Sequence, residues 1–153
     1  MIVLMRLVLR LFLTAAFSAS FVLGADVGVE RAMSEFVTAL NNLDWRTVSG
    51  FFVANATMFS PTIPERIEGS QLEAGWRKAL ENLRSRSTKL APPYLDVKPQ
   101  GMRIDQLSDD IAVVTFRLPS TTGVGLRTFI WKRFSNGWKI VHQHASSVEG
   151  TAK

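Results

Sequence analysis

The apolar positions that follow residue 28 recur at steps of three and four, which is the spacing of one helix face. They are Val29, Met33, Phe36, Val37, Leu40 and Leu43. This spacing predicts a helix over 29–43, which Asn41-Asn42 brings to an end. Asp44 is well suited to cap a second, short helix, whose apolar side would comprise Val48, Phe51 and Phe52.

A third helix is predicted to begin near Ser70, because Ser70 and Glu73 have the spacing of a capping box. Its buried face would be formed by Leu72, Trp76, Ala79, Leu80 and Leu83. The pair Pro92-Pro93 excludes any further helical turn.

The remaining segments have the pattern of strands. A brief strand is expected over 56–60, and extended chain is expected over 94–107, 111–118, 124–134 and 138–147. Asn136-Gly137 predicts a tight hairpin turn, because this pair tolerates positive φ. Three helices followed by an antiparallel meander predict an α+β fold with the helices on one face of a curved sheet.

The first 25 residues have the pattern of a signal peptide. Arg6 and Arg10 precede an uncharged apolar stretch over 11–23, and cleavage is expected after Gly24 or Ala25. The sequence therefore predicts one exported domain over 26–150, secreted or periplasmic and without membrane contact after cleavage. An uncleaved anchor is the alternative, although the uncharged stretch is short of the roughly 20 residues of a membrane span.

The amino-acid composition excludes several kinds of chemistry for this protein. The chain contains no cysteine, which excludes disulfides, thiolate nucleophiles and cysteine-ligated zinc. Its formal net charge is +5, but the basic residues are scattered and form no stripe with interleaved aromatic residues, so nucleic-acid binding is not expected. No phosphate loop or cofactor motif is found, and no cofactor is expected.

Two stretches resemble a known superfamily. Residues 36–61 read FVTALNNLDWRTVSGFFVANATMFSP, and residues 137–147 read GWKIVHQHASS. The first is similar to the opening of ketosteroid isomerases and SnoaL-like cyclases. The second is similar to the last strand of SnoaL-like domains and of the calcium/calmodulin-dependent kinase II association domain. The resemblance implies the nuclear transport factor two-like fold, a cone in which a curved antiparallel sheet and three helices enclose an apolar cavity.

The same resemblance argues against isomerase chemistry. Ser60 stands at the position that matches the family's general base, and Phe36 at the position of its oxyanion tyrosine. The third catalytic acid falls near Ile130. Serine without a neighbouring base does not shuttle protons near neutral pH, and phenylalanine donates no hydrogen bond. Whether the protein is an enzyme stays open at this point.

Strict alternation along the last strand places Trp138, Ile140, His142, His144 and Ser146 on one face, and the bulk of the first two assigns this face to the interior. His142 and His144 are the chain's two histidines. They are candidates for an acid/base or ligand-orienting pair, with a structural role as the alternative. A metal site would need a third ligand and is not expected. The other expected pocket residues are Trp76, Tyr94, Trp138, Ile140, Ser60 and Phe36.

Phe129 and Trp131 share a face of the long strand 124–134 with Arg127 and Arg133, and we expect this face to form a homodimer interface on the outside of the sheet. Three functions follow. The first is an exported domain that binds a small, largely apolar molecule. The second is an isomerase, cyclase or dehydratase that uses His142 or His144. The third is an oligomerisation module that acts through the outer sheet face.

Overall fold

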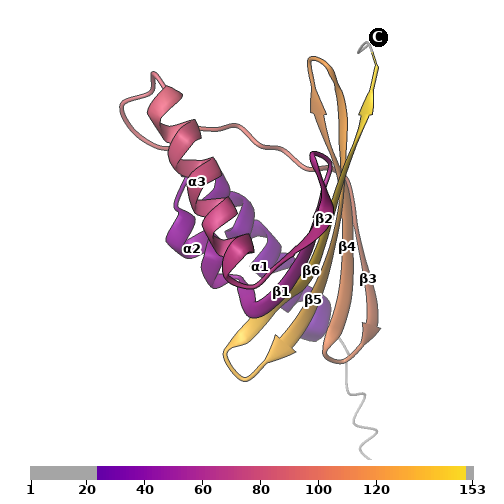
Figure 1. Ribbon diagram of the computed structural model, residues 1–153. Coiled ribbons are helices and arrows are strands. Elements are labelled where there is room, and N and C mark those ends of the chain that lie inside the picture. Colours follow the sequence, from indigo (N-terminus) through magenta and orange to yellow (C-terminus); the bar gives the residue numbers. More distant parts are fainter. Residues whose placement is uncertain (1–23, 151–153) are drawn as a thin grey trace, which may run out of the picture.

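The computed structural model describes residues 24–150, and side chains from residue 28 onward. The helices are α1 (Gly24–Asn41), α2 (Trp45–Gly50) and α3 (Ser70–Arg86). Figure 1 shows all three helices on one side of a curved sheet. In the described part of the chain, no helix is both long and apolar enough to span a membrane. The predicted signal peptide, residues 1–25, lies almost wholly outside the described residues and stays a prediction.

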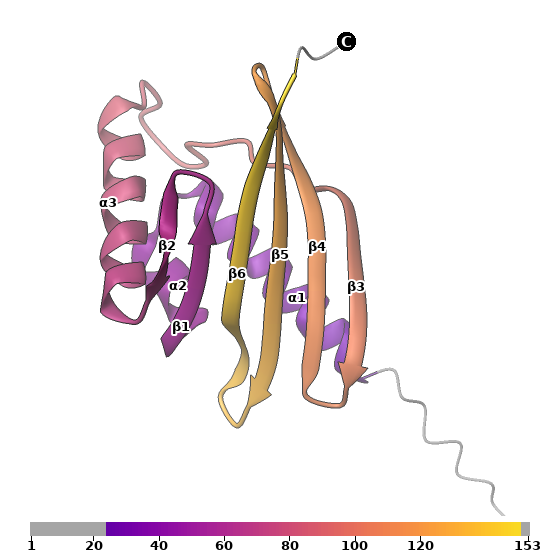
Figure 2. The same cartoon turned by 45° about the vertical axis from the view of Figure 1, so that its right-hand side comes forward.

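The six strands are β1 (Phe52–Ser60), β2 (Ile63–Glu68), β3 (Gln100–Ser108), β4 (Ile111–Ser120), β5 (Gly123–Phe134) and β6 (Gly137–Glu149). They form one sheet in the order β2-β1-β6-β5-β4-β3, which Figure 2 displays face on. All neighbours are antiparallel except β1 and β6, which run parallel. The predicted α+β class with a curved sheet is confirmed.

Two details near the start of the sheet differ from the prediction. Strand β1 begins at Phe52, which periodicity assigned to the second helix, and β2 was not predicted. Strand β2 is exposed at nearly every position, so it lacks the apolar alternation by which a strand is recognised.

The helix starts show one correct and one wrong prediction. Asp44 caps α2, because its Oδ1 accepts a hydrogen bond from the Thr47 amide at 3.2 Å. The predicted capping box of Ser70 and Glu73 does not form. Gly69 occupies the N-cap position with φ of 57°, and no side chain caps the helix. Ser70 is already helical, so its hydroxyl is not placed to cap.

The core lies between α1 and the inner, helix-facing side of the sheet. Phe36 of α1 is its centre and makes edge-on contacts with Phe51, Phe129 and Trp131, with ring centroids 5.7, 5.4 and 6.4 Å away. Phe129 and Trp131 are only 2% and 0% exposed. The prediction that these two residues form an outer dimer face is therefore wrong, because their side of β5 is the side that α1 covers.

Candidate functional site

A β-bulge in β6 decides which residues of this strand face the helices. Ile130 pairs with His142 and Trp131 pairs with Ile140, so Val141 is an extra residue opposite no partner. A bulge of one residue reverses the alternation of side chains that follow it. Trp138 and Ile140 are accordingly buried on the inner face before the bulge, whereas Gln143 and Ala145 are buried there after it.

The two histidines therefore point away from the helices, and the prediction that they face the enclosed hollow is wrong. His142 Nδ1 lies 2.7 Å from the Thr57 hydroxyl of β1. Both imidazoles lie 6.0 Å from the ring of Phe59. Burial lowers the pKa of His142 below its ordinary value, and the charges of His144 and Arg66 lower it further. This arrangement is a histidine cluster on the outer face of the sheet.

The inner face and the helices enclose a different group of residues. A cavity of about 200 Å³ lies between α3 and the sheet. Its walls are Met58 of β1, Gly75, Trp76 and Ala79 of α3, Arg127 of β5, and Gln143 and Ala145 of β6. A smaller space of about 30 Å³ extends toward α1 and shares Trp76, Arg127 and Gln143 with it. We call the two spaces together the α3–sheet cavity. It is a mostly apolar hollow with a few convergent polar groups, which is typical of a ligand site.

Two residues that line this cavity each have a buried polar side-chain atom without a partner among the described residues. These atoms are Oε1 of Gln143, a residue that is 3% exposed, and the indole Nε1 of Trp76. A buried polar group without a hydrogen bond costs roughly 1–3 kcal/mol. Both residues line the cavity, Trp76 from α3 and Gln143 from β6, so a small rotation of either side chain would bring an unpaired polar atom to a bound molecule.

Arg127 is the charged group of the cavity. Its Nη1 donates to the backbone carbonyls of Leu126 and Ser146 at 2.8 and 3.1 Å. Burial lowers the pKa of its guanidinium below the ordinary value. Across the described residues, none of the ion pairs involves Arg127. The guanidinium is therefore a half-buried cation that no carboxylate of the described chain neutralises.

Glycine at position 125 makes room for this guanidinium. Gly125 and Arg127 are two apart on β5, so both positions face the same side of the sheet. A Cβ at Gly125 would lie 3.0 Å from Nη1 and 3.1 Å from Nη2 of Arg127. The guanidinium therefore lies over the bare backbone of Gly125 instead of extending into solvent.

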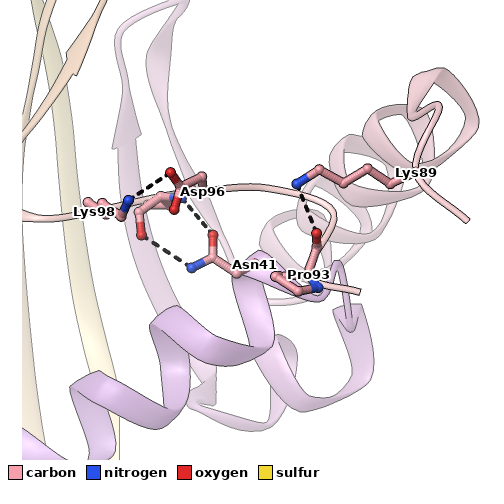
Figure 3. Close-up of polar contacts among 6 residues, drawn as sticks. Asn41, Lys89, Pro93, Asp96 and Lys98 are labelled. Atoms are coloured by element: carbon pink, nitrogen blue, oxygen red, sulfur yellow. Dashed lines mark hydrogen bonds and ion pairs between the residues drawn. The ribbon is translucent and has the colours of Figure 1, made fainter. Parts of the chain in front are cut away.

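The segment between α3 and β3 closes the α1 side of the cavity. Asn41, at the end of α1, accepts a hydrogen bond from the Val97 amide at 2.7 Å and donates one to the Val97 carbonyl at 3.2 Å (Figure 3). Its own carbonyl accepts from the amides of Tyr94 and Leu95 at 2.8 and 3.0 Å. Val97 and Pro99 of this segment line the smaller space. A single asparagine thus fixes this wall of the site.

The predicted pocket residues divide into two groups. Phe36 and Trp76 line the cavity. The others lie elsewhere. Trp138 packs on Gly28 and, with Ile140, belongs to the core. Tyr94 stacks against Arg84, and Ser60 bonds to Thr62 in the turn between β1 and β2.

Sequence reasoning missed Arg127 and Gln143, which are the two strongly polar residues of the cavity. Arg127 shares a strand face with Phe129 and Trp131, as expected, but that face is the inner one. The inward orientation of this face could have been predicted, because two large aromatic side chains at alternate positions of a central strand are better buried than exposed.

The surface has other hollows. One of about 290 Å³ lies at the start of α3 and shares Trp76 with the α3–sheet cavity. Another of about 390 Å³ lies beside residues 95–98 and contains none of the buried unpartnered atoms. Within residues 24–150, no three histidine, cysteine or acidic side chains come together as metal ligands.

Comparison with known protein families identifies the family to which this chain belongs. The model of the SnoaL-like domain family matches residues 29–149. The chain therefore belongs to the SnoaL-like domain family, and the resemblance drawn from its first and last segments is confirmed. None of the curated proteins compared matches the sequence.

Solved structures agree on the fold. An NTF2-like family protein from Streptomyces avermitilis, provisionally named a dehydratase, is 17% identical, with a TM-score of 0.67 over 81% of this chain and 96% of that one. The CamKII hub homology domain of Chlamydomonas reinhardtii is 20% identical, with a TM-score of 0.64 over 82% and 99%. A Parabacteroides distasonis protein, provisionally named a ketosteroid isomerase, is 24% identical, with a TM-score of 0.61 over 78% and 86%. These identities support the fold alone.

Proposed function

We propose that this protein is a binding domain for a small, largely apolar molecule, which it holds in the α3–sheet cavity. The observation that carries the proposal is Gln143, a residue of the cavity wall whose buried Oε1 has no partner within residues 24–150. The indole N–H of Trp76, on the wall that α3 forms, is a second buried polar group without a partner in the described chain. Apolar walls would supply most of the affinity, and these polar atoms would orient the ligand.

Binding is favoured over acid/base catalysis by the chemistry of the cavity walls. General acid/base catalysis works best with a group whose pKa is near the operating pH. The polar side chains of the cavity are an indole, an amide and a guanidinium, which do not titrate near neutral pH. The two histidines lie on the other face of the sheet. The alternative of an enzyme that uses His142 or His144 therefore finds no support in the geometry of this cavity.

The test fills the cavity and asks whether binding is lost. A Cβ at Gly75 would meet no atom within 4 Å, so Gly75→Leu places a side chain in open space at the cavity wall. Native mass spectrometry of the protein purified from its own host would report any retained molecule. We expect the wild type to carry a small molecule and Gly75→Leu to have lost it.

The matched control is Ala74→Leu, one residue earlier on α3 and outside the cavity wall. It should keep the retained molecule. Retention by Gly75→Leu at the wild-type level would contradict the proposed site, because the same leucine would then have no effect on the bound molecule.

Self-association through the outer sheet face is a second candidate. Phe59 and Leu126 are large apolar residues that are 39% and 38% exposed, and the histidine cluster lies on the same face as Phe59. The similar hub homology domain bears a name that denotes assembly. Light scattering coupled to size exclusion would test this candidate. A homodimer that Leu126→Lys converts to monomer would support it, whereas a wild-type monomer at high protein concentration would reject it.

We further propose that the domain acts outside the cytoplasm. The support is the sequence of residues 1–25, with two arginines before an uncharged apolar stretch. N-terminal sequencing of the protein from its host should find a start near residue 25. An intact Met1 on protein recovered from the cytoplasm would reject export.

A further inference from the structure

The charge of the α3–sheet cavity indicates the chemical class of its ligand. Arginine carries five N–H donors. In Arg127 the two hydrogen bonds of the guanidinium both leave Nη1, toward the carbonyls of Leu126 and Ser146. The N–H groups of Nε and Nη2 remain. These two form one edge of the guanidinium, and this edge matches the two oxygens of a carboxylate.

The surroundings of Arg127 favour an anion over a neutral polar group. The guanidinium is half-buried against the backbone of β5 and β6, and no ion pair within residues 24–150 neutralises it. A desolvated charge is costly unless it is paired. A ligand that brings one negative charge into the cavity would restore this balance. The indole N–H of Trp76 is a further donor, and Trp76 lines the cavity from the α3 side.

We propose that the ligand is a small apolar carboxylic acid, whose carboxylate pairs with the Nε–Nη2 edge of Arg127 while its apolar part lies against Met58, Trp76 and Ala79. This inference rests on the proposed binding function and adds the class of ligand. One guanidinium balances one negative charge, so the geometry points to a monocarboxylate. The cavity of about 200 Å³ limits it to a small molecule.

Gly125 is a positioning residue in this scheme. Its missing side chain lets the guanidinium lie flat over the strand, within 3.3 Å of where a Cβ would stand. Gly125→Ala would displace the end of a flexible side chain by a few tenths of an ångström. It should weaken acid binding by less than removal of the charge does, and it should leave the binding of a neutral analogue unchanged.

The experiment compares acids with their uncharged amides. Phenylacetate and phenylacetamide, and hexanoate and hexanamide, are matched in shape and differ in charge. Dissociation constants would be measured by NMR titration of the full mature chain. A charge-assisted pair predicts that wild type prefers the acids by roughly tenfold to a hundredfold. Arg127→Gln should abolish this preference, and Arg127→Lys, which keeps the charge but loses the fork, should restore part of it.

The control variant is Arg133→Gln, an exposed arginine on the same strand, which should keep the full preference for acids. Equal affinity of wild type for acids and amides would overturn the inference and leave the proposed binding function intact. A folded Arg127→Gln variant that still prefers acids would overturn the inference in the same way. Should Arg127→Gln fail to fold, the wild-type preference and Arg127→Lys still decide. Failure of every acid and amide to bind wild type would overturn the binding function itself.

Discussion

Replacing Gln143 by methionine should make the ligand-free protein more stable. Gln143 is 3% exposed, and its Oε1 has no partner in the part of the chain that the structure describes. Methionine has a similar length and no group that needs a hydrogen bond, and it adapts to irregular space. The cost of an unpaired buried polar group is about 1–3 kcal/mol. Because the cavity reaches solvent, we take the lower end of this range of energies. We therefore expect Gln143→Met to raise the unfolding free energy by about 1 kcal/mol.

Urea denaturation followed by tryptophan fluorescence would measure this change, and a thermal melt should show a rise of roughly 3 °C for a domain of this size. The control is Gln106→Met. The Oε1 of Gln106 is also buried and unpartnered, but its Nε2 bonds to the Ser108 carbonyl and it lies outside the cavity. This variant should leave ligand binding unchanged, whereas Gln143→Met should weaken it. A decrease of more than about 1 kcal/mol in the unfolding free energy of Gln143→Met would show that the Gln143 amide is hydrogen-bonded in the folded protein, contrary to this prediction.

Three further predictions concern the parts that support the site. Asn41→Ala removes the two side-chain bonds to Val97 and should cost about 2 kcal/mol by urea denaturation, with faster amide exchange at 94–97; unchanged exchange would contradict it. Asp44→Ala removes the cap of α2 and should cost about 1 kcal/mol; a thermal melt at the wild-type temperature would count against it. Burial and nearby positive charge lower the pKa of His142 in the folded protein. The unfolded chain, in which this pKa is near 6.5, therefore binds more protons at a pH between the two values. The free energy of unfolding should consequently fall as the pH drops below about 6.5. His142→Gln should flatten this pH dependence and His144→Gln should change it less, and an unaltered slope in His142→Gln would contradict the assignment.

The helices and the strands of the second half of the chain could be predicted from the sequence because their signals are local. The apolar spacing of Val29 to Leu43 and the cap at Asp44 each depend on residues within a few positions of one another. Strand β2 could not be found in this way. It is an exposed edge strand with no apolar face, and its pairing with β1 is what makes it a strand.

The site could be predicted only in part, and for the residues of β6 the reason is one residue. Alternation from Trp138 leads to His142 and His144 on the inner face, and the bulge at Val141 reverses that assignment. A bulge depends on how β6 pairs with its neighbours, which is not encoded in the local pattern of the strand. Phe36 and Trp76 were found because helical periodicity has no comparable interruption in α1 or α3.

Ligands should enter the α3–sheet cavity and not the histidine cluster on the outer face. The chain contains four tryptophans and two histidines, so their ring signals form a small and separable set of NMR probes. In a titration with phenylacetate, we predict that the indole N–H of Trp76 shifts most among the tryptophans, while the imidazole signals of His142 and His144 stay in place. Shifts confined to the two imidazoles, with the Trp76 indole signal unmoved, would contradict ligand binding in the α3–sheet cavity.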